Sequence, residues 1–420
     1  MSADDRGGVA DRRRLARRLT DAVNALADPA TPMVVVDLDA FDANAADLVR
    51  RAAGTSIRVA SKSLRIPALV SRALARDGFS GVLAYSLREA LWLVEHEVTD
   101  DVVLGYPTVD AGALRRLVSD PKALAAITLM VDDPAQLDLV DKVRAGVSTG
   151  STTGGGSTTG GVVRVAIDID AGLRLGRSHV GPKRSPLHDP DEVVAFAREV
   201  VARPGFALVG VMTYEGQVAG VPDDVPRQRA KSIVVRRLKA ASMTQLADRR
   251  RVLARALADL VDLEFWNAGG SGSVEATAAD AAVTEVAAGS GLLVPTLFDH
   301  YQSFEPRPAV FYGLRVVRRP SDGIATVAGG GFIASGPPGK DRAPTPWAPP
   351  GLHLTGLEGA GEVQTPLTGP GVPDLAIGDW VWFRHAKAGE LAEHTNLVHL
   401  LSGDAVVDVV PSYRGLGCAW

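Results

Sequence analysis

The sequence predicts an α/β fold, a (β/α)8 TIM barrel followed by a smaller C-terminal β domain. From Pro32 onward, eight apolar runs of strand length alternate with helical patterns. These runs are continuously apolar, which is typical of parallel strands buried on both faces. The alternation stops near Pro295, where prolines and glycines become dense and short β-rich runs replace the helical patterns. An open doubly wound sheet is the alternative architecture.

The eight strand candidates are 57–61, 81–86, 101–106, 126–132, 162–170, 208–216, 263–270 and 284–291. Helical patterns such as 67–78 and 191–205 lie between them, and Pro204 and Gly205 end the second of these. An earlier apolar run, 33–41, precedes the first unit and is expected outside the barrel.

The predicted organisation is an N-terminal helical extension (1–31), the barrel (32–300) and the C-terminal β domain (301–420). A Gly/Ser/Thr tract at 145–161 interrupts the barrel and is interpreted as a disordered insertion. It joins a helix to the next strand, so it is expected on the barrel face opposite the catalytic one.

Composition excludes several classes of function. A net charge of -4 predicts no attraction to nucleic acid or membranes, and the basic stretch 227–253 is interpreted as a solvated helix face. The single cysteine, Cys418, cannot form an intrachain disulfide, which suits a reducing cytoplasm. No secretory signal or membrane-spanning run is recognised, so a cytoplasmic location is expected.

Polar residues gather at the predicted carboxyl ends of the strands, where active sites of such barrels lie. They are Lys62, Tyr85, Ser86, Asp168, Asp170, Arg174, Tyr214, Glu215 and Asn267, with GGSGS (269–273) and GSGLL (289–293) after the last two strands. Asp168 and Arg174 could equally form a structural ion pair, and Glu285 and Asp299 are interpreted as structural.

The two glycine-rich turns predict a phosphate site. Glycines let the backbone approach an anion closely, and N–H groups and serine hydroxyls can bind its oxygens. Gly270, Ser271 and Gly272 in the first turn, and Ser290 and Gly291 in the second, are the candidate residues. The loops after the last two strands of such barrels recurrently bind phosphate.

A phosphate site on the same face as Lys62 gives this lysine a function. A lysine amine of lowered pKa attacks carbonyl groups and forms a Schiff base. A phosphorylated aldehyde held by its phosphate would present that aldehyde to Lys62. Pyridoxal phosphate is such a molecule, and it acts as an electron sink at Cα of amino acids.

The chain resembles the fold-type III pyridoxal-phosphate enzymes, within them the D-threonine aldolase and D-serine dehydratase group, over roughly residues 32–415. The resemblance rests on TPMVVVDLDAFDAN, RVASKSLRIP, DIDAGLRLGR, TYEGQ, GGSGS and GDAVVDVVPSYRG. It implies that Lys62 carries the cofactor, that Tyr214 contacts it and that Gly270, Ser271 and Gly272 bind its phosphate. It also implies a homodimer with active sites at the interface, and a lyase acting on D-β-hydroxy amino acids.

The chain departs from this group at its metal site. Members often bind a divalent metal, such as zinc or manganese, through a histidine and a cysteine or aspartate two residues later. Here His385 is present, but Lys387 stands at the second position and has no lone pair to donate while protonated. Either Glu390 or His394 completes a site with His385, or Lys387 supplies the positive charge itself; the second hypothesis is preferred.

Three other functions stay open on sequence grounds. An amino-acid racemase on this scaffold would need a second acid/base, for which Tyr312 and Tyr413 are available. A cofactor-carrier protein without catalysis is a further reading, which the large β domain argues against. The last is a cofactor-free Schiff-base aldolase acting on a phosphorylated sugar.

Overall fold

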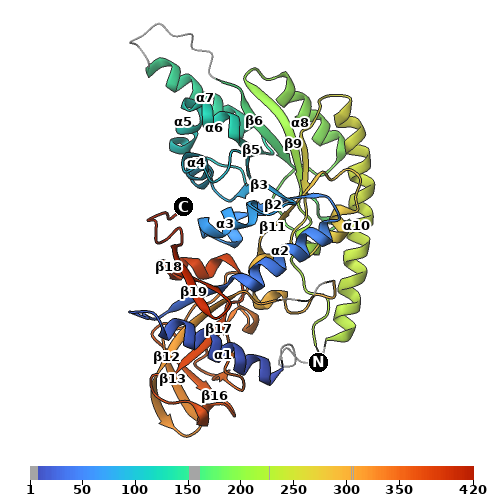
Figure 1. The fold of residues 1–420 in the computed structure, drawn as a ribbon. Helices are drawn as coiled ribbons and strands as arrows, with labels where there is room; N and C mark the ends of the chain where they lie inside the picture. The colour runs from blue at the N-terminus through green and yellow to red at the C-terminus, as the bar shows by residue number, and fades with distance from the viewer. Residues whose placement is uncertain (1–7, 151–160, 227, 304, 306) are drawn as a thin grey trace.

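The predicted barrel is present and closed (Figure 1). The structure is a computed structural model that describes residues 8–150, 161–226, 228–303, 305 and 307–420. Eight parallel strands follow one another around the barrel in chain order, and the last pairs with the first. They are β2 (Ser56–Ala60), β3 (Phe79–Ala84), β4 (Val102–Leu104), β5 (Ile127–Val131), β6 (Val163–Asp168), β9 (Phe206–Thr213), β10 (Phe265–Ala268) and β11 (Glu285–Ala288). Each overlaps one of the eight apolar runs of the sequence.

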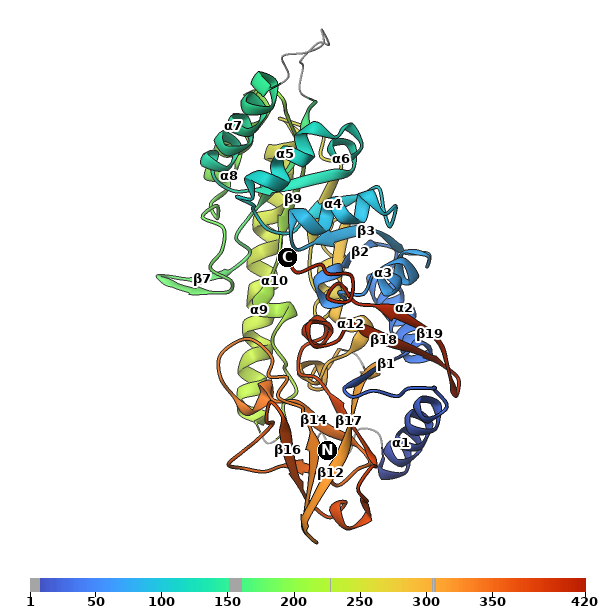
Figure 2. The same cartoon turned by 90° about the vertical axis from the view of Figure 1, so that its left-hand side faces the viewer.

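Helices form the outer layer of the barrel (Figures 1 and 2). Local sequence sets where they begin: the Ser86 hydroxyl accepts a hydrogen bond from the backbone N–H of Glu89 at the start of α4, and Pro190 opens α8. Ser86 is therefore a helix cap. The helices are α2 (Leu38–Ala52), α3 (Pro67–Leu74), α4 (Leu87–Glu95), α5 (Ala111–Ser119), α6 (Pro121–Ala126), α7 (Pro134–Gly150), α8 (Pro190–Ala202), α9 (Gly216–Ala219), α10 (Arg229–Ala258), α11 (Val274–Ala278) and α12 (Ser290–Leu293).

The barrel interior is filled by side chains rather than open. Val103, Met130 and Phe265 belong to an apolar cluster contributed by strands alone. Gly210 on β9 makes room for it, because a Cβ there would collide with the Phe265 ring. Beside this cluster, Arg58 forms a bidentate ion pair with Glu285. The packed interior leaves the strand ends as the place for a cavity.

The C-terminal region forms a nine-stranded sheet, as the β-rich runs predict. Its strands are β12 (Val310–Ser321), β13 (Ile324–Ala328), β14 (Thr345–Ala348), β15 (His353–Leu354), β16 (Gln364–Thr368), β17 (Trp380–Arg384), β18 (Leu397–Ser402), β19 (Ala405–Pro411) and β1 (Met33–Asp37). β1 runs antiparallel to β12 and parallel to β18, so the early apolar run lies outside the barrel as expected. Helix α1 (Val9–Asn24) packs on this sheet through Leu19 and Val23.

The Gly/Ser/Thr tract lies largely outside the described residues. Helix α7 ends at Gly150 and β6 begins at Val163, so the tract leads into the amino end of a barrel strand. The domain boundaries predicted at 31/32 and 300/301 stay predictions. A short hairpin, β7 (Leu173–Leu175) and β8 (Ser178–Val180), projects after β6 (Figure 2). Within the described residues, no helix is long and apolar enough to cross a membrane.

Candidate active site

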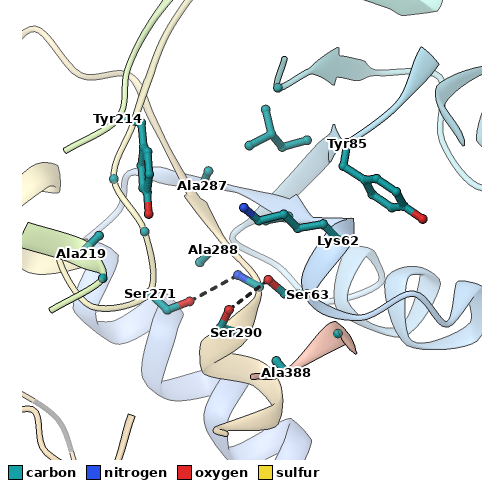
Figure 3. A pocket seen from close by; sticks show the side chains of 18 of the residues that line it. Lys62, Ser63, Tyr85, Tyr214, Ala219, Ser271, Ala287, Ala288, Ser290 and Ala388 are labelled. Atoms are coloured by element: carbon teal, nitrogen blue, oxygen red, sulfur yellow. Dashed lines mark hydrogen bonds between the residues drawn. The ribbon is translucent and has the colours of Figure 1, made fainter. Parts of the chain in front are cut away.

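A cavity of about 450 Å³ opens at the carboxyl ends of the barrel strands. Strand ends and barrel loops form most of its wall, and residues 386–390 of the β domain close one side. Lys62 reaches into it from the 3-10 turn Ser61–Ser63 that directly follows β2. Ser61 and Ser63 are buried, whereas Lys62 is exposed to the cavity. The turn therefore directs the lysine out of the barrel wall (Figure 3).

The Lys62 amine has a tyrosine partner that sequence reasoning missed. Its Nζ donates a hydrogen bond of 2.7 Å to the hydroxyl of Tyr106, which follows β4. The Arg184 guanidinium lies 5.9 Å from the Tyr106 ring and 5.8 Å from the Tyr214 ring. Tyr106 thus connects the lysine to a cationic side of the cavity. Its signal was available, because Tyr106 ends the third predicted strand.

The two glycine-rich turns meet on another side of the cavity. The Ser271 hydroxyl accepts hydrogen bonds from the backbone N–H groups of Gly291 (2.9 Å) and Gly289 (3.3 Å), and the hydroxyls of Ser63 and Ser290 are 2.9 Å apart (Figure 3). The first turn is thereby tied to the second, and the second to the Lys62 turn.

A buried carboxylate fixes the first glycine-rich turn from behind. Glu215 is fully buried and accepts hydrogen bonds from the backbone N–H of Gly269 (3.2 Å) and the hydroxyls of Ser273 (3.0 Å) and Thr277. It also forms a 3.1 Å ion pair with Arg250, which is likewise fully buried. Glu215 therefore positions the turn from outside the cavity.

Pyridoxal phosphate, which the sequence resemblance implies, fits the residues present. The cavity brings one amine, Lys62, onto the same wall system as glycines whose missing side chains leave room for a ligand. A Cβ at Gly270 would come within 2.9 Å of the Ala219 side chain, and one at Gly289 would collide with the Ala60 carbonyl oxygen. Serine hydroxyls stand beside these glycines, as phosphate binding requires.

Most of the predicted cofactor residues line the cavity, but two do not. Those that line it are Lys62, Tyr214, Asn267, Gly270, Ser271 and Ser290. Gly272 and Gly291 lie behind the wall: a Cβ at Gly272 would collide with the Ala219 carbonyl oxygen and the Tyr301 ring. The Asn267 amide donates to Glu285 (2.8 Å), which connects it to the Arg58 ion pair.

Burial changes the acidity of two groups that line the cavity. It raises the pKa of the Tyr214 phenol to about 12, so this group stays neutral. Burial, together with the negative charge of Asp132, raises the pKa of Asp168 to about 7. Arg184 opposes this shift of the Asp168 pKa. Asp168 is therefore the carboxyl group of the cavity that titrates near neutral pH.

The remaining strand-end residues have other partners. Arg174 lies outside the cavity on β7, and its ion-pair partner is Asp170 at 3.9 Å rather than Asp168. Asp170 also contacts His179, with 2.9 Å between Oδ2 and Nε2. Glu285 and Asp299 are held in bidentate ion pairs, the latter with Arg384. Both fit the structural role expected of them.

The β domain contributes a charged cluster to the cavity wall. The Lys387 Nζ donates to the Ser335 hydroxyl (2.7 Å) and lies 3.4 Å from the Glu390 carboxylate. His385 does not line the cavity; it is buried, which lowers its pKa, and its Nδ1 accepts a hydrogen bond from the backbone N–H of Lys387. His394 stacks on Phe332 instead, with ring centroids 4.3 Å apart.

A divalent metal does not fit these residues. Among the described residues, no group of three or more His, Cys, Asp or Glu side chains is placed to hold a metal ion. Glu390 is engaged by Ser335 and Lys387, and an ammonium beside a divalent cation would be repelled by it. The zinc or manganese site considered from the sequence is therefore not assembled around His385.

Comparison with solved structures finds the same fold in several enzymes. D-threonine aldolase from Filomicrobium marinum matches with a TM-score of 0.73 at 21% identity, covering 94% of this chain and 97% of that chain. D-threo-3-hydroxyaspartate dehydratase from Delftia sp. HT23 matches with a TM-score of 0.67 at 21% identity, covering 93% and 98%. An alanine racemase-like protein from Idiomarina loihiensis matches with a TM-score of 0.66 at 15% identity, covering 91% and 97%.

One matching structure is a cysteine-to-alanine mutant of D-threo-3-hydroxyaspartate dehydratase in the metal-free form. No curated protein matches this chain by sequence. At the identities found, the likeness to solved structures establishes the fold.

The family follows from a match across the barrel. The model of the alanine racemase N-terminal domain matches residues 36–295, more than half of the chain. This range contains the turn that carries Lys62, the strand end at Tyr214 and both glycine-rich turns. The chain belongs to the alanine racemase N-terminal domain family, whose barrel is that of the fold-type III pyridoxal-phosphate enzymes.

Proposed function

We propose that this chain is a pyridoxal-phosphate lyase that acts on a β-hydroxy amino acid of D configuration, such as D-threonine or D-serine. One observation carries the proposal: Lys62 and the glycine-rich turns around Ser271 and Ser290 line one cavity. An amine and a phosphate site facing the same space are what a phosphorylated aldehyde needs. Similarity to an aldolase and a dehydratase supports the lyase class.

Each residue then has a definite task. The cofactor, when bound, supplies an electron sink for the bonds at Cα of the substrate. Lys62 holds the cofactor and, once freed from it, moves a proton at Cα. Tyr106 orients the Lys62 amine through its hydrogen bond. Gly270, Ser271 and Ser290 bind the phosphate group, and the neutral Tyr214 borders the cofactor.

Two lyase reactions are compatible with this arrangement. Retro-aldol cleavage breaks Cα–Cβ and gives glycine and an aldehyde. Dehydration removes the Cα proton and the β-hydroxyl and ends in a 2-oxo acid and ammonia. The racemase alternative is less well supported, because Tyr312 and Tyr413 are both fully buried within the chain and neither lines the cavity. Neither tyrosine can serve a partner's cavity without being exposed.

The test of the cofactor assignment uses the purified holoenzyme. We expect an absorption band in the near ultraviolet or visible range, and borohydride reduction followed by peptide mapping should find the label on Lys62. Lys62→Ala should lose the band, whereas Lys122→Ala, at an exposed lysine of α6, should keep it. A label on another lysine would overturn the assignment.

The test of the reaction is product analysis with a panel of D- and L-β-hydroxy amino acids. Glycine with an aldehyde identifies an aldolase, and ammonia with a 2-oxo acid identifies a dehydratase. If only the enantiomer forms, the lyase proposal is wrong and the racemase alternative holds. The homodimer and the cytoplasmic location remain predictions from the sequence, and light scattering after gel filtration tests the first.

A further inference from the structure

A lysine ammonium stands in the cavity wall with its position fixed by two neighbours. Lys387 Nζ donates 2.7 Å to the Ser335 hydroxyl and is 3.4 Å from Glu390 Oε1. Glu390 in turn accepts hydrogen bonds from the Ser335 backbone N–H (2.8 Å) and hydroxyl (2.5 Å). All three side chains belong to residues that line the cavity containing Lys62. They form one closed hydrogen-bonded cluster.

This cluster leaves the ammonium able to bind a ligand. An ammonium group has three N–H donors, and Ser335 and Glu390 account for two of them. The Lys387 side chain is 36% exposed, so the remaining donor is accessible. A fixed cation with a free donor recognises an oxygen that carries or develops negative charge.

The same cluster excludes a metal ion from this place. Lys387 supplies a positive charge where a divalent cation would need ligands, and Glu390, the nearby carboxylate, is already bound by Ser335 and Lys387. His385 lies outside the cavity lining. The described residues offer no other set of three ligands.

We propose that Lys387, positioned by Ser335 and Glu390, forms a metal-free subsite for the oxygen on Cβ of the substrate. This inference rests on the proposed function, because it takes the substrate to be a β-hydroxy amino acid. The ammonium stabilises negative charge on that oxygen, whether Cα–Cβ or Cβ–O is the bond that breaks. Lys387 is then a catalytic residue, and Ser335 and Glu390 are positioning residues.

The first experiment measures metal content and chelator sensitivity of the holoenzyme. We expect less than about 0.1 equivalent of zinc or manganese by plasma mass spectrometry, and full activity after exhaustive treatment with a chelator. One equivalent of bound metal, or a chelated enzyme that is inactive and revived by zinc or manganese, overturns the proposal. Metal content is independent of whether the substrate has been identified.

The second experiment separates the subsite from the rest of the site. D-serine and D-alanine differ by the hydroxyl alone, and binding of each is followed by the change it causes in the cofactor absorption band. In Lys387→Met we expect D-serine affinity to fall at least 10-fold and turnover about 100-fold or more, with D-alanine affinity unchanged. Lys387→Arg, which keeps the charge, should restore part of the preference for D-serine.

Matched variants make the result specific. Lys122→Met removes a surface lysine on α6 and should change neither affinity. Ser335→Ala should lower turnover of D-serine without weakening D-alanine binding. Equal weakening of D-serine and D-alanine in Lys387→Met would show a general structural effect and contradict the subsite. If the wild-type band responds to no amino acid, the proposed function itself is wrong, and the subsite proposal falls with it.

Discussion

Gly389 lies against the main chain of Lys62, so closely that a Cβ at residue 389 would overlap the Lys62 carbonyl oxygen. Gly389 opens the 3-10 turn Gly389–His394 of the β domain, and it stands between Lys387 and Glu390. The proposed hydroxyl subsite therefore rests directly on the backbone that carries the proposed cofactor lysine. The two halves of the site are positioned by one contact between main chains.

Gly389→Ala is expected to damage the site through this contact. The obstacle is backbone rather than a flexible side chain, so the turn Gly389–His394 must move away from Lys62. We expect at least a 10-fold fall in turnover, about 1.4 kcal/mol in the activation barrier. The control is Gly356→Ala, because a Cβ at Gly356 meets nothing within 4 Å. Equal turnover in both variants would contradict the prediction.

Two adjacent arginines of α10 allow a matched test of burial. Arg250 is fully buried between Glu215 (3.1 Å) and Asp280 (3.2 Å), whereas Arg251 is 61% exposed and pairs with Asp248. Arg250→Met leaves the Glu215 carboxylate buried without its ion-pair partner. We expect it to lower the free energy of unfolding by about 3–5 kcal/mol, and Arg251→Met to change it by less than about 0.5 kcal/mol.

Denaturant unfolding of the two variants measures this difference. Because Glu215 holds the first glycine-rich turn, Arg250→Met should also weaken cofactor retention in dialysis, and Arg251→Met should not. A small effect for both variants would mean that the buried pair contributes little.

The barrel was predictable because its signals are local and repeated. Continuous apolar runs such as 126–132 and 162–170 can only be buried strands between helices, and each gave one barrel strand. The insertion of β1 between β12 and β18 was not predictable in detail. It depends on pairing across more than 270 residues, which no local pattern encodes.

The site was predictable where residues follow a strand, and not where loops bring them in. Lys62, Tyr214 and Ser271 come at or near strand ends and line the cavity. Arg184 comes from the loop between β8 and α8, and Ser335 from a loop of the β domain, with no pattern of their own. Their positions follow from tertiary packing alone.

The Gly/Ser/Thr tract is predicted to be dispensable for turnover. It connects α7 to the amino end of β6, whereas the cavity lies at the carboxyl ends of the strands. Loop-closure entropy changes slowly with loop length, so shortening costs little stability. Replacing 148–161 with a short turn should leave kcat within about 2-fold, measured under saturating substrate. A loss of 10-fold or more would place the tract's function closer to the chemistry.

Glu89 is the basis of a prediction on pH and stability. Its side chain is fully buried at the start of α4, and its Oε2 accepts a hydrogen bond of 2.8 Å from the Tyr85 backbone N–H. Burial nevertheless raises the pKa of Glu89 from an ordinary value of 4.5 to about 7. Between these two pH values the folded chain holds a proton at Glu89 that the unfolded chain has released.

The free energy of unfolding should therefore fall as pH rises from about 4.5 to about 7, because the unfolded state binds fewer protons in that window. Glu89→Gln removes this titration, so the stability of the variant relative to wild type should increase with pH, by at most about 1.4 kcal/mol per pH unit. Urea unfolding at pH 5, 6, 7 and 8 measures it. Glu95→Gln, at a 62% exposed position of the same helix, is the control and should run parallel to wild type. If the Glu89→Gln curve is also parallel to wild type, Glu89 is ionised in the folded chain throughout this range and burial does not control its pKa.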